Sequence, residues 1–194
     1  MNVLLEVPIS FLKNTYSILG SNNISVTIID QLLRQNSYTW VIVSDTSEEE
    51  SLYFSEYLST KYGFKITVSN YNSLTTMLSS IPVELAYVTG IDLERLLLFR
   101  KINTFHFPIV GLVHNCATRT TLKLLKSIMP YFMDEDVLIC PSQTTQEILL
   151  KMGFKKENTV VIPYGVDQNS FLPKPHEYGK LVQEKCYDYC KGWF

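Results

Sequence analysis

The sequence lacks the long apolar runs that a membrane protein needs. No stretch approaches the roughly 18 consecutive apolar residues of a transmembrane helix. The first basic residue is Lys13, so no positively charged leader precedes an apolar segment. We therefore expect neither a membrane span nor a signal peptide, and we predict a cytoplasmic protein.

An excess of positive charge is also missing. Lysine and arginine number 17 against 19 aspartates and glutamates, which gives a formal net charge of -2. A protein that binds nucleic acid needs a cationic surface to neutralise the phosphates. We therefore expect no nucleic-acid partner.

Cysteine is scarce, with four residues in the whole chain. Cys116 and Cys140 adjoin apolar segments, where a reduced, buried thiol is the usual state, so no disulfide framework is indicated. Cys186 and Cys190 follow His176 but lack a fourth ligand and the usual zinc spacing. We expect no metal site there.

Several catalytic and phosphate-binding motifs are absent. No G-x-G-x-x-G follows an apolar run and no G-x-x-x-x-G-K-[ST] occurs, which argues against a dehydrogenase or a P-loop enzyme. No G-x-S-x-G elbow presents a nucleophilic serine. The acidic triplet 134–136 precedes an apolar run rather than following it, so we interpret it as a solvated loop and not as a metal site. We expect no bound cofactor.

What the sequence does contain is an alternation of short apolar runs with longer amphipathic segments. That alternation is typical of βα units on a parallel sheet, and continuously apolar runs indicate burial on both faces. We predict a doubly wound, mostly parallel, Rossmann-like α/β domain over residues 1–171, followed by a linker or tail over 172–194. The expected strands are residues 2–7, 39–45, 64–69, 85–90, 109–114, 136–142 and 159–163.

Between these strands, helix ends are recognisable from local signals. A capping box of Ser47 with Glu50 predicts a helix that stops at Gly63, and Thr144 predicts the start of another that stops at Gly153. The segment after residue 118 carries basic residues interleaved with apolar ones. A core-facing helix is the stronger interpretation, and weak contact with an anionic membrane surface is the alternative.

In doubly wound sheets, ligands bind beyond the carboxyl ends of the strands. His114 stands at such an end, where a side chain can face the ligand crevice, although a lone histidine is more often structural. Asp45 is the only aspartate that ends an early strand. It lacks the acidic neighbours that a phosphoacceptor site of a flavodoxin-like signalling domain needs, so that class is disfavoured.

A longer stretch carries a family resemblance. The segment DVLICPSQTTQEILLKMGFKKENTVVIPYGVDQNSFLP resembles a junction found in GT-B glycosyltransferases of the retaining, glycogen-synthase-like group, also described as family 4-like. There, a strand ending in serine leads to a helix ending in glycine and then to a strand running into P-x-G-V-D and F-x-P. Upstream, PIVGLVHN resembles the strand of that family that carries an acceptor-side histidine. The resemblance covers roughly residues 83–173.

The resemblance implies roles for several residues. His114 would be the catalytic residue nearest the reacting sugar, and Asn115, Arg119 and Ser142 would contact the acceptor or a phosphate. Two further positions, Gly165 and Asp167, would belong to the hinge or linker between domains.

Two departures from the family pattern shape the functional expectation. Residues 21–23 read Ser-Asn-Asn where the family has a glycine-rich turn, and the sequence ends where the donor-binding domain would begin. We therefore expect the acceptor-binding half of a hexosyltransferase that moves a sugar from a nucleotide-sugar donor to a sugar or glycan acceptor, inactive alone, with a donor-domain subunit or a second copy as partner. The alternative is a non-catalytic Rossmann-like scaffolding module, or a truncated remnant, that docks a partner protein.

Overall fold

The computed structural model describes residues 1–13, 21–89, 92–114, 116 and 118–164. The chain divides into two units, Met1–Pro163 and Tyr164–Phe194. The expected domain boundary at residue 171 and the expected tail over 172–194 lie outside the described residues and stay predictions.

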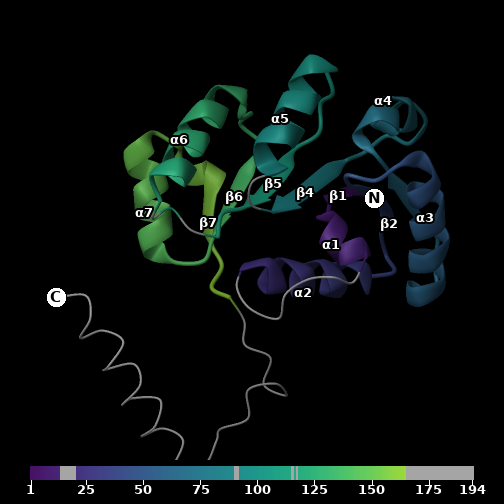
Figure 1. Cartoon of the computed structure of the whole chain (residues 1–194). Coiled ribbons are helices and arrows are strands. Elements are labelled where there is room, and N and C mark those ends of the chain that lie inside the picture. The colour runs from purple at the N-terminus through teal and green to yellow at the C-terminus, as the bar shows by residue number, and fades with distance from the viewer. Residues whose placement is uncertain (14–20, 90–91, 115, 117, 165–194) are drawn as a thin grey trace, which may run out of the picture. The chain divides into compact units, whose positions relative to one another are not determined.

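The described residues form a seven-stranded sheet in the order β3-β2-β1-β4-β5-β6-β7, and every neighbouring pair is parallel (Figure 1). This architecture confirms the predicted doubly wound, Rossmann-like α/β fold. The strands are β1 (Asn2–Glu6), β2 (Thr39–Val43), β3 (Ile66–Ser69), β4 (Leu85–Thr89), β5 (Ile109–Leu112), β6 (Val137–Cys140) and β7 (Thr159–Val161).

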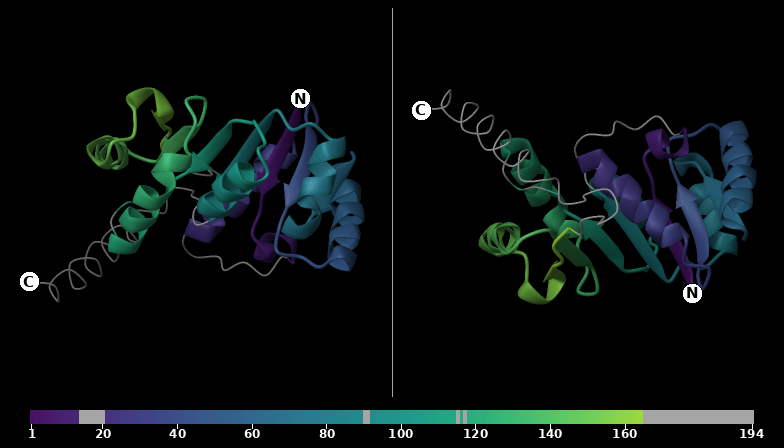
Figure 2. Two further views of the ribbon diagram at one scale, coloured as in Figure 1. Left: turned by 90° about the horizontal axis from the view of Figure 1, so that it is seen from above. Right: turned by 90° about the horizontal axis from the view of Figure 1, so that it is seen from below.

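Helices connect the strands and cover both faces of the sheet. They are α1 (Ile9–Leu12), α2 (Ser21–Leu33), α3 (Glu48–Tyr62), α4 (Tyr71–Ser80), α5 (Asp92–Ile102), α6 (Arg119–Ile128) and α7 (Gln143–Met152), with short 3-10 turns at Met129–Tyr131 and Lys156–Asn158. Figure 2 shows α2 and α5 on opposite faces of the sheet. Strands β1 and β2 are buried over most of their length, which explains their continuously apolar sequences, whereas β6 and β7 carry partly exposed residues such as Ile139 and Val160.

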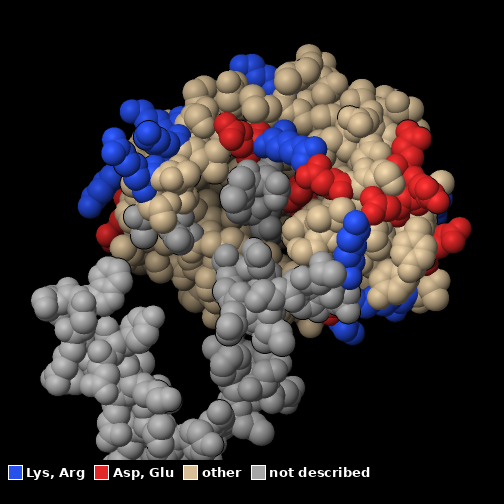
Figure 3. Space-filling model, in the orientation of Figure 1, with Lys and Arg blue, Asp and Glu red and all other residues tan. Residues whose placement is uncertain are grey.

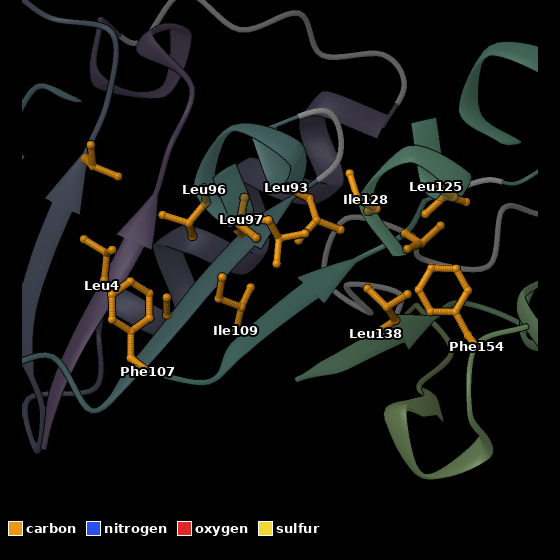
Figure 4. Packing of buried hydrophobic residues seen from close by; sticks show 14 of the residues in the cluster. Leu4, Leu93, Leu96, Leu97, Phe107, Ile109, Leu125, Ile128, Leu138 and Phe154 are labelled. Carbon is orange, nitrogen blue, oxygen red and sulfur yellow. The ribbon is translucent and has the colours of Figure 1, made fainter. Parts of the chain in front are cut away.

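The larger core lies between the sheet and helices α4 to α7 (Figure 4). Leu4, Ile109 and Leu138 enter it from three strands, and each is fully buried. From α5, Leu93 and Leu97 pack against them. Full burial of a leucine or isoleucine side chain contributes about 1.5–3 kcal/mol relative to exposure, so this layer supplies much of the driving force for folding.

The opposite face of the sheet is covered by α2 and α3. Ile29 and Leu33 of α2 are fully buried, and Phe54 and Leu58 of α3 are also buried. These helices are joined by Asp30, which accepts a 2.6 Å hydrogen bond from the hydroxyl of Tyr62. The position of α2 is therefore fixed both by apolar packing and by a polar contact.

The helix signals in the sequence are mostly confirmed. Ser47 and Glu50 form the capping box at the start of α3, and both Gly63 and Gly153 adopt left-handed conformations that end their helices. The prediction that Thr144 begins α7 is wrong. Ser142 is the N-cap, because its side chain accepts a hydrogen bond from the backbone of the third residue after it.

Segment 119–128 packs as a core-facing helix, α6, with Leu125 and Ile128 buried.

Cys116 and Cys140 are free and buried, as predicted. Across the described part of the chain, none of the helices has the length and apolar character needed to cross a membrane.

At the amino edge of the sheet, one charged residue contradicts the sequence interpretation. Asp134 and Glu135 are exposed, but Asp136 is completely buried. Its carboxylate accepts two 2.6 Å hydrogen bonds from Arg100, which is 2% exposed. Only Asp134 and Glu135 therefore behave as a solvated loop, because Asp136 is buried in an ion pair with Arg100 of α5.

Candidate functional site

The strand order reverses direction between β1 and β4, which makes their carboxyl ends a topological switch point. The chain runs from β1 outward through β2 to β3, then returns to the other side of β1 with β4. Connections that leave neighbouring strands in opposite directions create the crevice in which doubly wound sheets bind ligands. Glu6, the last residue of β1, is a buried carboxylate at this point.

His114 lies two residues beyond the end of β5, the strand that pairs with β4. Its neighbour Val113 belongs to the core on the α4 to α7 face, so the imidazole is directed toward the face covered by α2. There, Nε2 of His114 and Oγ of Ser25 share a hydrogen bond of 2.7 Å. The contact links α2, which follows β1, to the exit of β5 across the point where the strand order switches.

The imidazole of His114 is partly buried, and burial lowers its pKa below the ordinary value of 6.5. The neutral form of the side chain therefore predominates at pH 7. A neutral imidazole carries one donor and one acceptor nitrogen, and the Ser25 hydroxyl can match either role. The arrangement can hold the ring in one orientation for contact with a polar, uncharged group.

The other predicted site residues fall into two groups. Arg119 is exposed at the first position of α6, and Ser142 is the exposed N-cap of α7, so both lie on βα connections at the same sheet edge as His114. Asn115, Gly165 and Asp167 lie outside the described residues. Their predicted roles stay predictions.

A second polar cluster occupies the same edge of the sheet on the α4 and α5 side. Nη1 of Arg95, in the first turn of α5, is 2.6 Å from a carboxylate oxygen of Asp45, which follows β2. The guanidinium of Arg95 also lies 3.7 Å from the ring centroid of Tyr71, the first residue of α4. Figure 3 shows basic and acidic side chains side by side near α5.

Sequence reasoning missed Ser25 and Arg95, and it considered Asp45 only as a phosphoacceptor. One signal was present for Ser25. Ser25 lies four residues before the apolar Ile29, so helical periodicity places Ser25 on the buried face of α2. A buried hydroxyl requires a hydrogen-bond partner. No such signal pairs Asp45 with Arg95, which are brought together only by the tertiary fold.

A metal centre finds no support in the described part of the chain, where no three His, Cys, Asp or Glu side chains are grouped so that they could hold an ion. The polar groups described at this edge are a histidine, hydroxyls, the buried Glu6, the exposed Arg119 and the Asp45–Arg95 ion pair. These groups are suited to hydrogen bonding with a polar ligand.

No protein-family model matches the chain, and no curated protein matches its sequence significantly. Solved structures do match. The crystal structure of Anabaena HepE in complex with UDP-glucose superposes with a TM-score of 0.57 at 16% identity, over 95% of this chain and 49% of that one. HepE in complex with UDP and glucose gives 0.57 at 15% identity, over 94% and 49%. HepE with UDP gives 0.53 at 17% identity, again over 94% and 49%.

At these identities the comparison defines the fold. The chain has the same α/β architecture as part of HepE, and it spans about half the length of the structures it matches.

Proposed function

We propose that this chain is the acceptor-side half of a glycosyltransferase of the GT-B type, and that it helps to move a sugar from a nucleotide-sugar donor to a sugar or glycan acceptor. The observation that carries the proposal is the 2.7 Å contact between Ser25 and His114 near the carboxyl ends of the strands. It occurs in a fold shared with about half of HepE, whose crystal structures hold UDP-glucose, UDP and glucose.

In this proposal, His114 positions a hydroxyl group of the sugar. The imidazole is neutral because burial lowers its pKa, so it can exchange hydrogen bonds with an uncharged hydroxyl. Ser25 keeps the ring in one orientation. Holding the two substrates in a reactive geometry is a large part of catalysis in group transfer, so a fixed imidazole orientation matters directly for rate.

Arg119 is proposed to approach the phosphates of the donor from the start of α6. No acidic residue occupies the first turn of that helix. A cation there is disfavoured by the helix dipole, so Arg119 gains nothing in helix stability from its position. The nucleotide itself is proposed to be held mostly by residues outside these 194 residues, with Asn115, Ser142, Gly165 and Asp167 in the contact and hinge roles that the family resemblance implies.

The test compares two histidines in the same chain. Nucleotide release from UDP-glucose and related donors is measured in the chain isolated with its native neighbours, for the wild type, His114→Ala and the exposed His106→Ala. We expect His114→Ala to lower transfer by roughly a hundredfold, as is usual for removal of a positioned catalytic group, with an unchanged circular dichroism spectrum. The His106 variant should retain full activity.

Two results would contradict the proposal. Equal transfer by the wild type and His114→Ala would remove His114 from the reaction. Tight binding of UDP-glucose by the chain alone, measured by isothermal titration, would contradict the placement of the donor site outside these residues.

A second candidate function is protein docking without catalysis. It is favoured by an apolar group on α3, where Leu52 is 71% exposed, Tyr53 62% and Tyr57 43%. The two tyrosine rings stack at 6.3 Å. Large exposed apolar side chains grouped on one helix face are typical of interaction surfaces. This function would be supported if no donor were turned over in any sample.

A further inference from the structure

The geometry points to a second ligand subsite at Asp45, Arg95 and Tyr71, and we propose that it binds two neighbouring hydroxyl groups of an uncharged sugar. This inference rests on the proposed function, because it places part of the acceptor on the α4 and α5 side of the same sheet edge. Neither the sequence patterns nor the similarity to HepE assigns a role to these three residues.

The ion pair is close but remains open to solvent. Nη1 of Arg95 and Oδ1 of Asp45 are 2.6 Å apart, yet the side chains are 42% and 65% exposed. A carboxylate has about four acceptor positions and a guanidinium has five N–H donors, so one mutual contact leaves both groups with capacity for more hydrogen bonds. The exposed fractions show that both side chains remain accessible to a ligand from the solvent.

The position of the Arg95 side chain is fixed by stacking on an aromatic ring. Its guanidinium lies 3.7 Å from the centroid of Tyr71, and that ring meets Phe99 edge to face at 6.0 Å between centroids. The next residue on α5, Leu96, is fully buried. A guanidinium stacked on a fixed ring, on a helix anchored in the core, presents its free N–H groups in a constant direction.

The backbone that carries Asp45 is also fixed on both sides. The Ser44 hydroxyl donates to the backbone oxygen of Val7 at 2.7 Å, and the backbone N–H of Thr46 donates to the oxygen of Ser44 at 3.0 Å. The Thr46 hydroxyl is 2.7 Å from that of Ser51 on α3. Little ordering is therefore required when a ligand binds, which favours affinity.

The chemistry of the pair selects a neutral diol over an ion. The charges of Asp45 and Arg95 cancel, so a phosphate would meet a repelling carboxylate and an amine would meet a repelling guanidinium. A sugar with adjacent hydroxyls avoids both penalties. One hydroxyl donates to the Asp45 carboxylate while its neighbour accepts from the Arg95 guanidinium, and hydrogen bonds to charged groups are the stronger class.

The experiment is a titration of the isotopically labelled full chain by NMR, with methyl β-D-glucopyranoside as the probe at millimolar concentration. We expect amide shifts at Asp45, Thr46 and Arg95. The fully O-methylated glycoside, which cannot donate, and inorganic phosphate at matched ionic strength should leave these amides unchanged.

Matched variants separate the subsite from general surface effects. Asp45→Asn and Arg95→Ala should each weaken the apparent affinity by roughly tenfold or more, as expected when one or two charge-assisted hydrogen bonds are lost. The controls are Asp134→Asn, which removes an exposed pair with Lys155, and Lys101→Ala. Lys101 lies on the same helix as Arg95, and its ammonium lies over the ring of Tyr131. Both controls should bind like the wild type.

The inference is overturned if the glycoside causes no shifts at these amides, if the Asp45 and Arg95 variants bind as well as the wild type, or if phosphate binds as strongly as the glycoside. The titration needs neither donor nor transfer. Its failure would therefore leave the His114 test untouched, and loss of the His114 role would leave sugar binding at Asp45 measurable.

Discussion

Replacing Asp136 by asparagine should destabilise the protein far more than the same change at Asp134, two residues earlier in the same acidic triplet. The Asp136 carboxylate accepts four hydrogen bonds. Two come from Arg100 at 2.6 Å, one from the backbone N–H of Ile109 at 2.8 Å and one from that of Met133 at 2.8 Å. The side chains of Asp136 and Arg100 are 0% and 3% exposed.

The magnitude follows from what asparagine cannot do. The single carbonyl oxygen of asparagine can accept hydrogen bonds only in place of one carboxylate oxygen. In place of the other oxygen, the NH₂ group is itself a donor and cannot accept from the N–H groups that point at it. The Arg100 cation also loses its counter-charge while its remaining bonds, to the backbone oxygens of Phe107 and Tyr131, keep it buried. Breaking a buried ion pair in this way typically costs about 3–5 kcal/mol, which is about a fifth or more of the roughly 5–15 kcal/mol by which an ordinary domain is stable.

The assay is urea unfolding followed by circular dichroism. With a urea dependence of about 1–3 kcal/mol per molar, a loss of 3 kcal/mol lowers the midpoint by at least about 1 M. Asp134→Asn breaks only an exposed pair with Lys155, so its midpoint should match that of the wild type. A midpoint for Asp136→Asn within the error of the Asp134 variant would refute the reasoning, because the buried pair would then contribute no more than a surface one.

Two further predictions concern the strand that ends at the site. A Cβ atom on Gly111 would lie 3.0 Å from Leu93 and 3.1 Å from Leu138, both buried, so Gly111→Ala should lose about 1–3 kcal/mol in the same urea assay, and an unchanged midpoint would contradict it. Burial lowers the pKa of His114 in the folded chain, whereas in the unfolded chain the pKa keeps its ordinary value of 6.5. As the pH falls, His114 therefore takes up a proton in the unfolded chain before it does so in the folded chain. The free energy of unfolding should therefore decrease below pH 6.5 in the wild type, less so in His114→Gln, and NMR titration of the imidazole should give a value below 6.5.

The positions of all the strands could be predicted because each is a short apolar run between helices, and the end of β3 at Ser69 was also expected, but the carboxyl ends of the other strands could not be predicted. Residues 44–45 and 113–114 were expected to continue their strands, and both pairs leave the ladder. Ser44 and Val113 each make one last backbone hydrogen bond, to Ser69 and Ile139, before the chain turns. The residues that follow, Asp45 and His114, belong to the candidate site. There the apolar pattern of the sequence no longer predicts the backbone conformation.

The polar pairs depended on contacts between distant parts of the chain. Ser25 and His114 are 89 residues apart in sequence, and Arg100 and Asp136 are 36 apart. No local pattern encodes such a pairing. Arg100 nevertheless left a trace, since it follows Leu93, Leu96 and Leu97 at helical spacing and so lies on the buried face of α5. A buried arginine requires an acidic partner, and that requirement could have identified one of the acidic residues as buried.

The two arginines of α5 show how one helix serves the two edges of the sheet differently. Arg100 lies in the last turn, where a cation complements the helix dipole, and its ion pair is buried and fully hydrogen-bonded. Arg95 lies in the first turn, where the dipole disfavours a cation, and its pair with Asp45 is largely exposed, so the pair adds little to stability. The Arg95 guanidinium is thus held on a rigid helix where it gains little stability, and it can still form hydrogen bonds with a ligand. Ligand binding explains this arrangement better than folding does. Arg95 also lies at the carboxyl ends of the strands, where parallel sheets bind their ligands.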